Sequence, residues 1–160
     1  MLSQTSLGVI HSYSTSFDVE EAGTSFELAF TRADMDGAPS SVVVLPEPFE
    51  ITAPEPGFTF SRSEEGAELS VLWDNESSED MVVSLSGDCI SFYEETETSD
   101  SGSHVIPASW FAENDFESDS TSCPVTLTVN RILEGTVDPE FNGGNSTAMQ
   151  RRSVIFDLIP

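Results

Sequence analysis

The fold of this chain is decided by the segment Cys123-Pro-Val-Thr-Leu-Thr-Val-Asn-Arg131. Its apolar residues alternate with polar ones, and a period of two is typical of a strand with one buried face. A second segment, Met81-Val-Val-Ser-Leu-Ser-Gly-Asp-Cys89, alternates in the same way. Each cysteine shares the apolar phase of its own segment, so both thiols are expected to point into the core. We therefore predict a buried disulfide between Cys89 and Cys123, which contributes roughly 3–4 kcal/mol to stability.

Short apolar or alternating segments recur along the rest of the chain, separated by proline, glycine and acidic residues. They lie at residues 7–19, 26–31, 42–51, 58–60, 69–73, 105–106 and 154–158. No segment sustains a helical period, although Pro107 to Asn114 is expected to form a short helical turn. Residues 94–102 are so polar that we expect a solvated loop there. Eight or nine short strands with turns between them predict an all-β fold, an antiparallel β-sandwich in a single domain spanning residues 1–160.

The charge of the chain is strongly negative. Asp and Glu number 29 against five basic residues, which gives a net charge of −24, and lysine is absent. Such a surface repels nucleic acid and anionic membranes, because binding to either needs clustered basic residues. Two interpretations remain: the acidic side chains keep the protein soluble in saline or variable surroundings, or some of them bind divalent cations.

Two features bear on the compartment. Cysteines in strand phase favour an oxidising environment over a metal site, which needs more ligands at short spacing. Apolar runs such as Val42 to Leu45 are far too short to span a bilayer. The start of the chain, Met1 to Ile10, has neither the basic residues nor the apolar run of a signal peptide. Export, which we expect, therefore requires that a leader has been removed.

The arginines follow an unusual pattern. Four of the five, Arg32, Arg62, Arg131 and Arg152, lie at strand ends in the phase of the core residues. One interpretation is a cationic pocket for an anionic ligand. The other is structural: each stem covers an end of the core while its guanidinium pairs with a carboxylate. We predict that all four are partly buried and ion-paired.

Six segments carry a resemblance to a known family. They are Leu69-Ser-Val-Leu-Trp73, Ser86-Gly-Asp-Cys89, Asp100-Ser-Gly-Ser-His-Val-Ile-Pro107, Cys123-Pro-Val-Thr-Leu-Thr-Val-Asn-Arg131, Gly135-Thr-Val-Asp-Pro139 and Arg152-Ser-Val-Ile-Phe156. In this order they resemble an uncharacterised β-sandwich module at the C-terminus of predicted secreted lipoproteins of myxobacterial type. The resemblance implies an immunoglobulin-like sandwich with one disulfide and an envelope or extracellular location. It implies no activity and no catalytic residues.

The sequence does not favour an enzyme. His11 and His104 are the only histidines, and each lies among serine and threonine residues. A Ser, a His and an Asp can be selected on paper in any chain of this composition, so such a selection carries no weight. The chain has no nucleophile elbow, no His-Glu-x-x-His motif and no glycine-rich phosphate loop. We therefore predict a non-catalytic protein.

Calcium is the cofactor that the sequence supports best. Asp34-Met-Asp36-Gly37 has the opening spacing of an oxygen-ligand loop, but it lacks the remaining ligands of an EF-hand. Residues 74–80 hold a second acidic cluster. Because Asp, Asn and Gly also dominate turns that bind no ion, turn chemistry is the alternative explanation for both. Asp34 and Asp36 are the candidate metal ligands.

One aromatic pair is a candidate binding surface. Trp110 and Phe111 follow Pro107, and together they would suit a platform for stacking a sugar or contacting a partner. The alternative is that the pair splits, so that one ring closes the end of the sandwich and the other lies over it.

These observations predict an exported structural or adhesive module of a bacterial envelope or extracellular assembly. The alternative is a calcium-dependent module that binds carbohydrate or another polymer at the cell surface. A third reading concerns residues 1–16, which are expected to form an edge or donor strand. That strand would add to the sheet edge of a neighbour, giving self-assembly.

Overall fold

The computed structural model of the chain describes residues 3–7, 10–31, 37–61, 64, 66–97, 100–113 and 122–160. Within these residues the regular secondary structure is almost entirely β, with one short α-helix and one 3-10 helix. The elements are β1 (Ser3–Leu7), β2 (Ile10–Ser14), β3 (Ser25–Phe30), β4 (Ala38–Val44), β5 (Ile51–Ala53), β6 (Thr59–Ser61), β7 (Glu68–Trp73), β8 (Asp80–Gly87), β9 (Tyr93–Glu97), β10 (Ser103–Pro107), α1 (Ala108–Glu113), β11 (Cys123–Glu134), η1 (Pro139–Phe141) and β12 (Thr147–Ile159). The prediction of an all-β fold is therefore confirmed.

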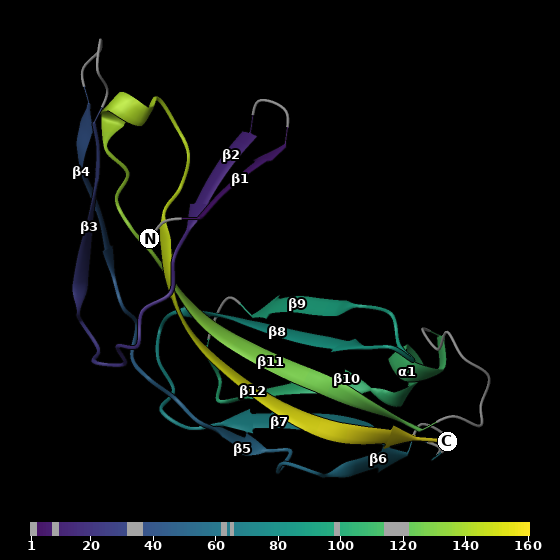
Figure 1. Cartoon of the computed structure of the whole chain (residues 1–160). Helices are drawn as coiled ribbons and strands as arrows, with labels where there is room; N and C mark the ends of the chain where they lie inside the picture. The colour runs from purple at the N-terminus through teal and green to yellow at the C-terminus, as the bar shows by residue number, and fades with distance from the viewer. Residues whose placement is uncertain are drawn as a thin grey trace.

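Two sheets form the main body and lie one above the other in Figure 1. One has five strands in the order β6-β12-β11-β8-β9, and the other has three in the order β10-β7-β5. The ladders of the described strands are antiparallel except for β6, which runs parallel to the end of β12. Such an arrangement of two antiparallel layers is a β-sandwich.

The core lies between these sheets and follows the period of two that the sequence predicts. Every second residue of β7 is buried, namely Leu69, Val71 and Trp73. β8, β11 and β12 contribute their alternate residues from the opposite side, so that one continuous cluster fills the space. At roughly 25 cal/mol for each Å² of apolar surface removed from water, this burial is the main stabilising contribution.

The predicted disulfide is confirmed. Cys89 and Cys123 are bonded, buried and have Cα atoms 6.2 Å apart. Gly87 at the end of β8 pairs with Val125 of β11, so the cysteines lie just beyond the last paired residues of two neighbouring strands. The bond therefore closes one end of the five-stranded sheet instead of joining the two sheets.

Strand β9 corrects an expectation. Residues 94–102 were expected to form a solvated loop, but residues 93–97 pair with β8 from Leu85 to Met81. The free edge of β8 supplies backbone hydrogen bonds, and buried Tyr93 anchors the strand to the core. These gains outweigh the low strand propensity of the glutamates, whose side chains at Glu94 and Glu95 are exposed to water.

β11 and β12 are longer than predicted and continue beyond the sandwich (Figure 1). Their extension carries the β3–β4 hairpin, and Val43, Leu45 and Ala148 form a second small core there. At Gly135 the chain crosses β4 so closely that an added Cβ would overlap the carbonyl oxygen of Val42. Val42 and Thr136 exchange two backbone hydrogen bonds, of 2.9 and 2.8 Å, across this crossing.

Asp138 strengthens the same junction. Its Oδ2 accepts hydrogen bonds from the backbone and side chain of Ser40, at 2.9 and 2.6 Å. Its Oδ1 accepts from the backbone N–H of Glu140 at 2.9 Å and so caps η1. These bonds, with that from the Ser40 hydroxyl the largest, lower the pKa of Asp138 below its ordinary value of 3.8.

The remaining elements are short. α1 spans six residues at the end of the sandwich, and no helix in the described ranges is long and apolar enough to cross a membrane. The N-terminal strands β1 and β2 pair with each other, from Leu7↔Ile10 to Ser3↔Ser14.

Candidate functional site

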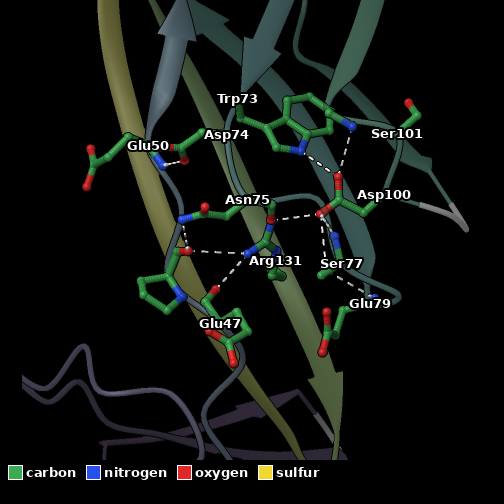
Figure 2. A network of polar contacts seen from close by, with 12 residues as sticks. Glu47, Glu50, Trp73, Asp74, Asn75, Ser77, Glu79, Asp100, Ser101 and Arg131 are labelled. Carbon is green, nitrogen blue, oxygen red and sulfur yellow. Dashed lines mark hydrogen bonds and ion pairs between the residues drawn. The ribbon is translucent and has the colours of Figure 1, made fainter.

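A buried ion pair is the most prominent polar feature of the sandwich. Arg131 lies on the inward phase of β11 and is fully buried. Its Nη2 is 2.7 Å from Oδ2 of Asp100, and neither side chain is exposed to solvent. Figure 2 shows the pair with its neighbours. Since an unpaired charge in this position would be strongly destabilising, each group depends on the other.

The carboxylate of Asp100 accepts further hydrogen bonds, drawn in Figure 2. Oδ1 accepts from Nε1 of Trp73 at 2.6 Å and from the backbone N–H of Gly102 at 3.1 Å. Oδ2 accepts from both the backbone N–H and the hydroxyl of Ser77, each at 3.1 Å. We refer to these five residues, Trp73, Ser77, Asp100, Gly102 and Arg131, as the Asp100 network.

The guanidinium of Arg131 also ties down two loops. Nη1 donates to the carbonyl oxygens of Glu47 and Pro48, at 2.9 and 3.4 Å, and Nη2 donates to the carbonyl oxygen of Asn75. The guanidinium carbon lies 5.0 Å from the centre of the buried Phe49 ring. The β4–β5 and β7–β8 connections are thereby held against β11, in the manner of a structural arginine.

The network keeps Asp100 ionised. Burial by itself raises the pKa of Asp100, but the hydrogen bonds from Trp73, Gly102, Arg131 and Ser77 act in the opposite direction and prevail. The pKa of Asp100 is therefore lowered from its ordinary value of 3.8. Hydrogen bonds made to the charged form of an acid favour that form.

This arrangement suits a structural role. An ionised carboxylate offers about four lone-pair positions, and five donors already occupy those of Asp100. No lone pair is left to take a proton from a substrate or to coordinate an ion. The Asp100 network therefore fixes loops to the core.

Arg152 forms a second, more exposed ion-paired site. It is partly buried, and its guanidinium is 3.3 Å from Glu20 and 3.1 Å from Glu50. It lines a groove of about 590 Å³ between β5 and β12, whose walls include Ile51 and Ile155. Because two carboxylates already neutralise Arg152, the structure favours the ion-paired interpretation over an anion pocket here. Arg32 and Arg62 lie outside the described residues.

The aromatic pair on α1 is split between two environments. Phe111 is fully buried, with its ring centre 4.9 Å from that of Phe60. Trp110 is partly buried and stands edge-on to Tyr93, with 4.9 Å between ring centres. This is the arrangement of the alternative interpretation, in which one ring closes the sandwich and the other lies over it.

The candidate calcium ligands Asp34 and Asp36 lie outside the described residues. Among the residues that the structure describes, His, Cys, Asp and Glu side chains form no group of three or more that could hold a metal ion.

Sequence reasoning missed a second polar cluster, which joins buried Tyr93 and His104 to exposed Glu95. The hydroxyl of Tyr93 lies 2.7 Å from Nε2 of His104 and donates to Oε2 of Glu95 at 2.5 Å. His104 is buried on β10, whereas Tyr93 and Glu95 lie on β9, so the contact links the edges of the two sheets. The only indication in the sequence is that His104 lies two residues before Ile106 and so faces the same side of the strand.

Asp100 was missed for a different reason. It is one of many acidic residues in a polar stretch, and no spacing distinguishes it from its neighbours. Its role depends on Arg131, which lies 31 residues further along the chain.

These features define an all-β protein with two facing sheets, a disulfide between neighbouring strands of one sheet, and a buried structural ion pair. No family of known proteins and no curated protein matches the chain in sequence.

Proposed function

We propose that this chain is a non-catalytic structural or adhesive module, exported to a bacterial envelope or extracellular assembly. The observation that carries the proposal is the buried Cys89–Cys123 disulfide. Structural disulfides form and persist in oxidising compartments and are rare in the cytosol. The Asp100 network adds support, because its carboxylate is fully occupied in holding loops and has no lone pair left for chemistry.

The finer class that we propose is an immunoglobulin-like sandwich. Support comes from eight strands in two facing sheets, with Trp73 packed in the common core. The disulfide differs from that of antibody domains, where it joins the two sheets. Here it joins neighbours in one sheet, so the proposed likeness concerns architecture and not a shared binding mode.

The compartment is tested by the redox state of the cysteines in the source cells. Cells are quenched in acid, and free thiols are labelled with a heavy maleimide before and after reduction. We expect no label on the native chain without reduction and two labels after it. A Cys89→Ser/Cys123→Ser variant, expressed in the same cells, controls for nonspecific labelling. Two labels before reduction would contradict export to an oxidising compartment.

The adhesive role is tested separately. Fluorescent wild-type protein is applied to source cells and to their purified surface polysaccharide, with calcium or with a chelator. We expect retention on cells that chelation does not change. Retention that requires calcium and is reproduced by the polysaccharide alone would favour the alternative, a calcium-dependent polymer-binding module. Turnover of any surface polymer by the protein would contradict the non-catalytic assignment.

A further inference from the structure

The N-terminal hairpin forms a two-stranded sheet of its own. β1 and β2 are paired with each other, and within the described residues neither strand joins a ladder of the other sheets. Figure 1 shows the hairpin projecting away from both sheets of the sandwich. An isolated two-stranded hairpin is only marginally stable in water, whereas three or more strands can be stable. Within the described part of the chain, both outer edges of the hairpin therefore lack a ladder partner, and an added strand would stabilise the hairpin.

The hairpin is also exceptional in charge. Residues 1–17 contain no Asp, Glu, Lys or Arg, although the whole chain carries 29 acidic and five basic residues. Two copies with a net charge of −24 repel each other over most of their surface. The uncharged segment is the place where two copies can approach with the least repulsion.

Three other strand edges, those of β9, β10 and β5, are protected against such pairing. β9 is the last strand of the five-stranded sheet, and it carries Glu94, Glu95 and Glu97. β10 ends at Pro107, and β5 is three residues long and followed by Pro54. Charges, prolines and short length are the devices by which proteins prevent edge-to-edge association. β1 and β2 have no charged residue and no proline.

We propose that this hairpin is a self-association surface, which pairs with the hairpin of a second copy. One free edge from each copy meets the other in antiparallel register across a two-fold axis, which gives a four-stranded sheet. Such an isologous contact closes on itself, so pairing through this one edge gives a dimer. The proposal goes beyond the proposed function and does not depend on export, since it rests on backbone pairing and charge alone.

The test is sedimentation velocity of the full-length chain over a range of concentrations, at low and high sodium chloride. We expect a dimer whose fraction rises with concentration and also with salt, because salt screens the repulsion between the acidic bodies. Hydrogen exchange provides a second readout: amides of residues 3–14 should become more protected as the protein concentration rises.

The decisive variant is Gln4→Glu/Ser12→Glu, which places one acid on each strand of the hairpin. We expect its association constant to fall by about tenfold or more, because like charges meet across the new strand pair. High salt should restore part of this loss, which separates repulsion from unfolding of the hairpin. The melting temperature should stay within about 2 °C of wild type, since within the described residues neither hairpin strand joins a ladder of the sandwich.

Two matched controls carry an added acid elsewhere. Asn145→Asp changes an amide to an acid, as Gln4→Glu does, at an exposed position, and Thr96→Glu adds an acid to the protected edge at β9. Both should dimerise like wild type. A wild-type chain that stays monomeric at all concentrations in high salt would overturn the proposal. It would also be overturned by a dimer that Thr96→Glu weakens and the hairpin variant leaves intact.

Discussion

Replacing Arg131 with methionine tests whether the Asp100 network holds the sandwich together. Methionine keeps most of the packed length but removes the charge and every hydrogen bond that the guanidinium donates. Asp100 then remains a buried carboxylate with no cation beside it. Removing one partner of a buried ion pair costs about 3–5 kcal/mol. Since Trp73, Ser77 and Gly102 still donate to Asp100, we expect a loss near the lower limit, about 3 kcal/mol.

The measurement is unfolding in urea, followed by tryptophan fluorescence and by circular dichroism. Trp73 donates to Asp100 and therefore reports on the network itself. Arg151→Met is the matched control, because Arg151 is exposed and its Nε donates to the amide oxygen of Asn130 instead of to a carboxylate. We expect this control to change the free energy of unfolding by no more than about 0.5 kcal/mol.

A double variant separates the ion pair from packing. In Asp100→Asn/Arg131→Met neither group is charged, so the penalty of a lone buried charge disappears. The double variant should therefore be more stable than the sum of the single losses predicts, by about 2 kcal/mol. Additive losses, or an Arg131→Met variant as stable as Arg151→Met, would show that the pair is incidental to stability.

Three further changes should have measurable effects. Reducing the Cys89–Cys123 disulfide, whose cysteines are 34 residues apart in sequence, should lower the free energy of unfolding by roughly 3–4 kcal/mol. Calorimetry with and without reductant should then show a melting temperature lowered by about 6–16 °C. An unchanged melting temperature would contradict this. Asp100 and Asp138 both have a pKa lowered from 3.8, so their contribution to folding stability is complete above about pH 4 and is lost as the pH falls through the folded-state pKa. In Asp100→Asn, the free energy of unfolding should therefore fall less steeply with decreasing pH. An equally steep fall in the variant would argue against this role of Asp100. Salt should raise the melting temperature because it screens a net charge of −24. Calcium should raise it more than sodium does at equal ionic strength. Identical melting temperatures at low and high salt would mean that the charges are too dispersed to affect stability.

Much of the fold could be predicted because strand periodicity is a local property of the chain. The alternation from Cys123 to Arg131 places every second side chain on one face, whatever the remaining residues do. The inward phase of both cysteines followed from that rule, and so did the inward phase of Arg131. β9 and the first half of β12 escaped prediction because charged or polar residues, such as Glu95, Gln150 and Arg151, occupy positions where the rule expects a clearer apolar pattern.

The partners in the interior depended on tertiary structure alone. The sequence offers 29 acids to Arg131, and spacing does not distinguish them. Asp100 is selected because it lies, shortly before β10, against Arg131 of β11, where Trp73 and Ser77 also present donors. Likewise, the cysteines are neighbours within one sheet only because β8 and β11 pair in that register. Sequence alone determined which side chains turn inward, since that depends on adjacent residues. The tertiary structure decided which of them meet, since that depends on how distant segments pack.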